Sequence, residues 1–116
     1  MKGHEATMKI RPYRLSQVSM GDFTLAGYSI AGEESVIIAP ELDVSFDIGR
    51  CPCEALTINH VLLSHGHADH SVGLLYYFAQ RDFQGIEGGL AVVPENLLGP
   101  LEVLLKAWGR VEGHVP

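Results

Sequence analysis

The chain has 116 residues, of which 47% are hydrophobic and 19% are charged, so it can form one small domain with a buried core. Its formal net charge of −6 argues against a general binder of nucleic acid or anionic membranes, because phosphate groups would be repelled on average. No apolar stretch reaches the ~18 residues that a membrane span requires, and residues 1–30 lack the apolar run of an export signal.

Half of the eight basic residues lie within the first 14 positions: Lys2, Lys9, Arg11 and Arg14. We expect this segment to be solvated, with a small basic patch as the alternative. The two cysteines, Cys51 and Cys53, stand one proline apart, so a disulfide between them would be strained. We therefore expect reduced thiols in a loop and a cytoplasmic protein that does not contact a membrane.

Short apolar and β-branched runs alternate with turn residues in the first half of the chain. The runs cover residues 13–19, 23–31, 35–39 and 44–49, and Gly, Asp and Glu dominate the turns between them. Strands at this spacing are typical of an antiparallel meander. Residues 58–64, INHVLLS, form a further apolar run, which predicts a buried strand.

The second half of the chain changes to helical periodicity. A helix is predicted over about residues 70–82, with Tyr76 in the core and Tyr77 exposed, because four residues recur there at helical spacing: Val72, Leu75, Tyr76 and Ala79. Residues 90–94 predict a short strand, and an amphipathic helix is expected from near Pro100 onward, with Trp108 as a packing residue. The order is a β-meander followed by β-α-β-α, which is a mixed α/β (α+β) fold in one domain, residues 1–116.

The run HGHADH contains three of the six histidines of the chain and directly follows the predicted buried strand. Gly66 and Ala68 are small, so the backbone can turn sharply between the other four side chains. Imidazole and carboxylate groups are ligands that suit zinc, manganese or iron. The run alone cannot complete a metal site, so either further ligands come from elsewhere or two metals share distant ligands. The candidate ligands are His65, His67, Asp69 and His70.

Two other interpretations of these histidines stay open. They could be turn residues without a metal, or part of a structural zinc site that draws on Cys51 and Cys53. His60, within the preceding strand, is expected to be a hydrogen-bonded structural residue. His114 follows a helix near the end of the chain, where we expect a solvated residue and not a ligand.

The run HGHADH resembles the H-x-H-x-D-H motif of the metallo-β-lactamase-fold hydrolases, and HVLLS before it and SVGLL after it resemble the usual context of that motif. Upstream, VSFDIG resembles the strand of this family that ends in an aspartate. The resemblance extends over residues 15–110. It implies that His65 and His67 bind one metal and that Asp69 and His70 bind a second. It also implies that Asp47 holds a ligand in place through hydrogen bonds.

The resemblance further implies a fold, and here the chain departs from the family pattern. Family members pack two β–α halves into an αββα sandwich, and the chain resembles the N-terminal half only. The later family ligands (a histidine, a bridging aspartate and a final histidine) have no counterpart at the end of an apolar strand here. We therefore expect a partial domain over residues 1–116, truncated at its C-terminal end. It would be a fragment of a longer hydrolase or complete its site as a homo-oligomer.

The activity that the resemblance implies is metal-dependent hydrolysis by a zinc-activated water. Two zinc ions are expected in the complete family site, with manganese or iron as alternatives, and Asp69 would orient the water or accept its proton. The substrate would be a phosphodiester, either a small molecule or a nucleic acid as in the tRNA 3′-end endonucleases, or another ester or thioester. The alternative function is a non-catalytic, truncated module that binds metal or a partner.

Overall fold

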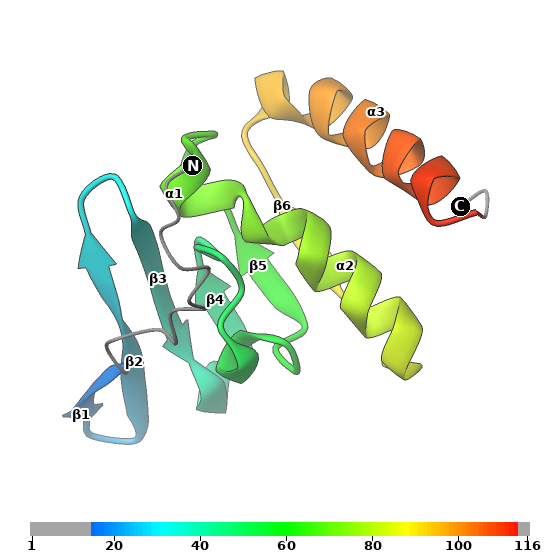
Figure 1. The fold of residues 1–116 in the computed structure, drawn as a ribbon. Helices are drawn as coiled ribbons and strands as arrows, with labels where there is room; N and C mark the ends of the chain where they lie inside the picture. Colours follow the sequence, from blue (N-terminus) through cyan, green and yellow to red (C-terminus); the bar gives the residue numbers. More distant parts are fainter. Residues whose placement is uncertain (1–14, 114–116) are drawn as a thin grey trace, which may run out of the picture.

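The computed structural model describes residues 15–113. His114 and the four basic residues that precede Leu15 therefore lie outside the described residues. One sheet contains six strands in sequence order, and three α-helices and two short 3₁₀ helices accompany it (Figure 1). The strands are β1 Ser16–Met20, β2 Phe23–Ile30, β3 Glu34–Ala39, β4 Val44–Phe46, β5 His60–Leu62 and β6 Leu90–Val92. The helices are η1 Pro40–Leu42, η2 Cys53–Ala55, α1 Ala68–Ser71, α2 Gly73–Gln84 and α3 Glu95–Val111.

The sheet changes from antiparallel to parallel pairing at β4. Strands β1 to β4 form the predicted meander, and β5 and β6 then add in parallel to β4. The connection from β5 to β6 passes through α1 and α2, as parallel strands require a crossover. The prediction of a β-meander followed by β-α-β-α is therefore confirmed.

The core lies between the sheet and α2. Ile38, Ser45, Val61 and Ala91 are register partners across β3 to β6, so they share one face of the sheet. The α2 residues Leu74 and Tyr77 belong to the same buried set. Each large apolar side chain that is buried in this way stabilises the fold by about 1.5–3 kcal/mol.

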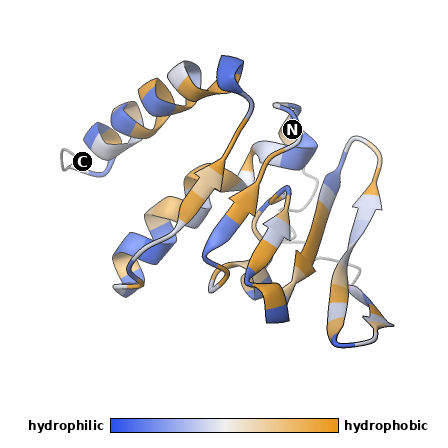
Figure 2. Cartoon of the chain, turned by 180° about the vertical axis from the view of Figure 1, so that it is seen from behind, coloured by the Kyte–Doolittle hydropathy of each residue, from blue (hydrophilic) through white to orange (hydrophobic). Residues whose placement is uncertain are grey.

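The opposite face of the sheet carries a second row of partners, Ile37, Phe46, Leu62 and Val92. Ile37, Phe46 and Val92 are exposed to solvent although they are apolar. Figure 2 views the molecule from behind and shows these strands with no α-helix in front of them. The side chains of this row form an apolar stripe on the face of the sheet that none of the helices within residues 15–113 covers.

The predicted orientation of α2 was wrong. Tyr77 is fully buried, and its hydroxyl donates to the carbonyl of Ile58, whereas Tyr76 is 52% exposed. Both sides of this helix are apolar, so periodicity alone could not decide which side faces the sheet. The side that contains Val72 and Tyr76 instead borders a hollow shared with Trp108 of α3. The predicted helix is also divided at Val72 into α1 and α2.

The last helix, α3, begins at Glu95 and not near Pro100 as predicted. Proline lacks an N–H group, so the carbonyl of Asn96 loses its usual helical donor. Asn96 is exposed in the first turn, where water can replace that donor at little cost. Within residues 15–113, none of the helices combines the length and the apolar character that a bilayer span needs.

Arg81 of α2 ties together the loops at the starts of β5 and β6. Its side chain is buried, and its Nη1 donates to the carbonyls of Leu56 (2.8 Å) and Ile58 (3.2 Å). Its Nη2 donates to Asn59 Oδ1 (2.6 Å) and to the carbonyl of Glu87 (3.0 Å). One cationic side chain therefore satisfies four acceptors, which would lose this donor if the guanidinium were removed.

We expect Arg81→Met to lower the free energy of unfolding by about 3 kcal/mol, because four buried or partly buried acceptors lose a charged donor. Urea denaturation followed by circular dichroism measures this loss. Arg110→Met, which changes an exposed arginine of α3, is the matched control. A loss for Arg81→Met no larger than that of the control would contradict the role of Arg81.

Asp43 joins the start of β4 to the start of β5. Its Oδ1 accepts from the Asn59 amide (2.8 Å) and its Oδ2 from the Asn59 side chain (3.0 Å). The backbone bond from Asn59, then the side-chain bond, holds the pKa of Asp43 below its ordinary value, with smaller effects of His60 and Arg81 in the same direction. Because the folded pKa lies below the unfolded one, the stabilisation is present above about pH 4 and decreases as the pH falls through the folded pKa.

We expect Asp43→Asn to be less stable than the unmodified chain at pH 7, and this difference to vanish as the pH approaches about 2. Thermal unfolding of both proteins at a series of pH values measures the difference. A difference that stays constant between these pH values would contradict the assignment.

Candidate metal centre

The run HGHADH lies just beyond the carboxyl end of β5. That strand ends at Leu62, the amide of Leu63 still donates to the carbonyl of Val92 (2.9 Å), and the chain then turns into α1. Because β4, β5 and β6 are parallel, their carboxyl ends meet at the same edge of the sheet. This is the edge at which open α/β sheets bind ligands.

Asp47 follows β4 and reaches across this edge. Its backbone is left-handed (φ 62), and its amide donates to the carbonyl of Leu62 at 2.8 Å. Its Oδ1 accepts from the Ser64 amide (2.7 Å) and its Oδ2 from the Ser64 hydroxyl (2.8 Å). The His70 ring lies 2.9 Å from the same Oδ2 through its Nδ1. One carboxyl group therefore joins the ends of β4 and β5 to α1.

The ionisation of Asp47 determines the tautomer of His70. Burial raises the pKa of Asp47, but the Ser64 amide, the His70 ring and the Ser64 hydroxyl together lower it more, so the pKa lies below its ordinary value. The carboxylate is charged at neutral pH and can only accept hydrogen bonds. A neutral His70 therefore carries its proton on Nδ1, which leaves a lone pair on Nε2 for a metal.

Ser64 orients the first histidine of the run in a similar way. Its hydroxyl has one hydrogen, which points to the Asp47 carboxylate. Its oxygen lies 2.9 Å from His65 Nδ1 and therefore accepts from that ring. His65 is thus also left with Nε2 as its metal-binding atom. Both rings are held by Asp47, His70 directly and His65 through one hydroxyl.

The structure brings the four predicted ligands together. The ring centroids of His65 and His67 are 4.6 Å apart at an interplanar angle of 85°, and those of His65 and His70 are 4.1 Å apart at 51°. Asp69 Oδ2 lies 3.3 Å from His70 Nε2. The four side chains therefore form a row of neighbours at the start of α1, in the order His67, His65, His70 and Asp69.

The chemistry of this donor set fits a zinc, manganese or iron ion, but the side chains do not converge as they stand. Within residues 15–113, no three His, Cys, Asp or Glu side chains are placed so that they could hold one ion. At His70, the Asp69 carboxylate lies 3.3 Å from Nε2, the atom that would face a metal ion. Metal binding would require these side chains to rotate away from one another and toward a shared ion.

Ser64 is the residue of this site that the sequence analysis missed. It contacts both Asp47 and His65, yet no role was predicted for it. The available signal was its position, a hydroxyl residue at the end of an apolar strand and directly before the first histidine. Asp47 bonds to His70, one of the predicted ligands, and its role in holding a metal ligand in place stays a prediction.

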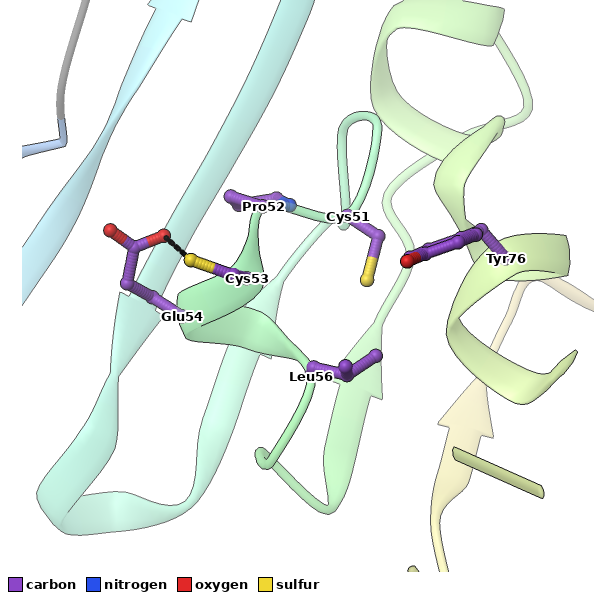
Figure 3. A pocket seen from close by; sticks show the side chains of 6 residues that line it. All are labelled: Cys51, Pro52, Cys53, Glu54, Leu56 and Tyr76. Atoms are coloured by element: carbon purple, nitrogen blue, oxygen red, sulfur yellow. Dashed lines mark hydrogen bonds between the residues drawn. The ribbon is translucent and has the colours of Figure 1, made fainter. Parts of the chain in front are cut away.

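The two cysteines line a hollow of about 520 Å³ together with Pro52, Glu54, Leu56 and Tyr76. Figure 3 shows the Cys51 sulfur directed into the space between Leu56 and the hydroxyl end of Tyr76, whereas the Cys53 sulfur lies 3.5 Å from Glu54 Oε1. Neither cysteine forms a disulfide. Because the two sulfurs point in different directions, they do not form a joint ligand pair.

The structural role predicted for His60 is also found. Its Nδ1 lies 2.9 Å from the carbonyl oxygen of Asp43, at the start of β5 and so at the far end of that strand from HGHADH. His60 is therefore a histidine of β5 that lies outside the HGHADH cluster.

Comparison with known proteins identifies relatives that share most of this chain. It is 36% identical over 101 residues to the chloroplastic tRNase Z TRZ2 of Arabidopsis thaliana, a match that covers 84% of the chain. It is 34% identical over 90 residues to tRNase Z TRZ1 of the same plant, covering 78% of the chain. The chain belongs to the metallo-β-lactamase-fold superfamily. A nuclear ribonuclease Z of Triticum aestivum is 39% identical over 75 residues.

These matches cover only part of each relative. The chain spans 28% of the first relative, 32% of the second and 43% of the third. No protein-family model matches the chain. The six-stranded sheet with its helices is consistent with part of the metallo-β-lactamase fold, as the motif predicted.

We expect Asp47→Asn to weaken Zn²⁺ binding by about 10–100-fold, because the amide nitrogen cannot accept the bonds that orient His70 and Ser64. Competition with a chromophoric chelator measures the dissociation constant. Asp43→Asn is the matched control, since it makes the same change at the opposite end of β4. Equal affinities for the two variants would contradict the role of Asp47.

Proposed function

We propose that this chain carries part of the metal centre of a hydrolase that cleaves phosphodiester bonds in RNA, as its relatives named tRNase Z do. The observation that carries the proposal is the Asp47 carboxylate, which contacts both Ser64 and His70 at the carboxyl edge of the parallel strands. A group that orients the second nitrogen of a histidine is the usual companion of a metal-ligating imidazole.

In the proposed site, His65 and His67 would hold one metal ion, and Asp69 and His70 would hold a second. A bound metal pair would supply Lewis acidity, which polarises a phosphodiester and acidifies a water molecule. Asp69 would accept a proton from a water molecule, while Asp47 would keep His70 in the required tautomer. We propose zinc as the metal, with manganese or iron as alternatives, because imidazole and carboxylate ligands suit all three.

The proposed substrate is RNA, although the chain has a net charge of −6. A metal centre attracts phosphate locally, so the average charge does not oppose binding at this edge of the sheet. The further possibilities of a small phosphodiester, another ester or a thioester share the same chemistry. The cytoplasmic location stays a prediction, because the name of one relative places that protein in the chloroplast.

A second candidate function is a module that binds metal or a partner without catalysis. The observation that favours it is that residues 71–113 contain no histidine, so the described part of the chain adds no imidazole ligand after His70. For either candidate function, further imidazole ligands would come from a second copy of this chain or from other parts of a longer protein that contains this domain. Metal content and turnover, measured on the same sample, distinguish the two functions.

We expect the unmodified chain to bind Zn²⁺ and to hydrolyse bis-p-nitrophenyl phosphate. The double variant His65→Ala/His67→Ala should lower both uptake and turnover, the latter by at least about 100-fold, since loss of a ligand exceeds loss of a group that orients one. Equilibrium dialysis with metal analysis measures uptake, and p-nitrophenolate absorbance measures turnover.

His60→Ala is the matched control, because it removes a histidine of β5 that lies outside the cluster. Uptake without turnover in the unmodified chain would favour the non-catalytic module. An unmodified chain that takes up no Zn²⁺ would contradict both candidate functions as metal-binding proteins.

A further inference from the structure

Glu34, the first residue of β3, is a carboxyl group without any exposed surface. A buried carboxyl group is costly unless hydrogen bonds satisfy its oxygens. Oε1 accepts from the hydroxyl of Tyr28 at 2.8 Å, and Oε2 accepts from the backbone amide of Arg50 at 2.8 Å. The second bond links β3 to the segment that follows β4.

That segment, residues 47–51, has an unusual backbone and is packed from two sides. Asp47, Gly49 and Cys51 all have left-handed φ angles, of 62°, 54° and 61°. A Cβ atom on Gly49 would lie 2.5 Å from Glu34 Cγ, and one on Gly73 would lie 2.3 Å from the backbone nitrogen of Cys51. Left-handed residues other than glycine persist only where the surroundings enforce them. Glu34 and the first residue of α2 provide these surroundings.

The same segment holds His70 by its backbone as well as by its ring. The amides of Ile48 (3.0 Å) and Gly49 (3.2 Å) both donate to the carbonyl of His70, and the amide of Gly73 donates to the carbonyl of Gly49 (2.7 Å). Asp47, in the same segment, binds the His70 ring. The position of His70 therefore depends on the conformation of residues 47–51.

We infer that Glu34 is a positioning residue of the metal centre: by binding the Arg50 amide and packing on Gly49, it fixes residues 47–51 and through them His70. This inference rests on the proposed function, in which His70 binds metal. Glu34 acts on His70 through residues 47–51, which bind both its carboxylate and the carbonyl of His70. Its hydrogen bond to Arg50 joins residues 16 positions apart in the sequence.

The test is Glu34→Gln, which keeps the size of the side chain but replaces one acceptor oxygen with an amino group. We expect Zn²⁺ to bind about 10-fold more weakly, as for other residues that orient ligands. We also expect amide hydrogen exchange at Ile48 and Gly49 to accelerate by about 10-fold, because their bonds to His70 open more often. Chelator competition and exchange followed by NMR measure the two effects on the whole chain.

Ser35→Ala is the matched control. Ser35 is the next residue of β3, is also buried, and bonds to Ser29 of β2 at 2.8 Å. The Ser35→Ala variant should be less stable, but its Zn²⁺ affinity should not change. Amide hydrogen exchange at Ile48 and Gly49 should not accelerate more than exchange elsewhere in the chain. If Glu34→Gln does not fold, Tyr28→Phe removes the hydrogen bond from the Tyr28 hydroxyl to Glu34 and should produce the same two effects to a smaller degree.

The outcomes separate this inference from the proposed function. Unchanged exchange at Ile48 and Gly49 in a folded Glu34→Gln variant, or changes equal to those of Ser35→Ala, would overturn the positioning role. In another outcome, the unmodified chain binds no Zn²⁺ while Glu34→Gln still accelerates exchange at Ile48 and Gly49. That result would overturn the proposed metal centre, but it would support the role of Glu34 in fixing the position of His70.

Discussion

The carboxylate of Asp47 is the interaction on which the arrangement at this edge of the sheet depends. It brings together groups that the chain places far apart, since Ser64 lies 17 residues and His70 lies 23 residues further along. A carboxylate has several acceptor positions and no donor, so it fixes the direction of every hydrogen that points to it. Three of these hydrogens, two from Ser64 and one from His70, belong to residues next to or within HGHADH, and the geometry of that run follows from them.

Much of this site was predictable because its chemistry is local. His65, His67, Asp69 and His70 lie within six residues, so their proximity needs no knowledge of the fold. The alternation of strands and turns is local too, and it predicted the meander. Asp47 is distant in sequence, and the resemblance to a known family predicted its role where periodicity could not.

The parts that the sequence did not predict depend on packing between distant segments. An apolar residue on either side of α2 would suit a core, and only the position of the sheet places Tyr77 inside and Tyr76 outside. Arg81 and Glu34 would each be expected at the surface from their charge. Both are buried, because backbone groups 16 to 25 residues away supply partners that no local pattern shows.

The contact between Gly73 and residues 49–51 has a consequence for motion. With the α-carbon of Gly73 directly against the backbone of Cys51, neither segment can shift without displacing the other. The loop after β4 and the first turn of α2 therefore move as one rigid body, and the histidine run between β5 and α2 is carried by it. The candidate ligands can therefore rearrange in two ways that differ in timescale. The exposed ring of His67 rotates within nanoseconds, whereas a displacement of the backbone that supports the rings requires a collective shift on the microsecond-to-millisecond scale.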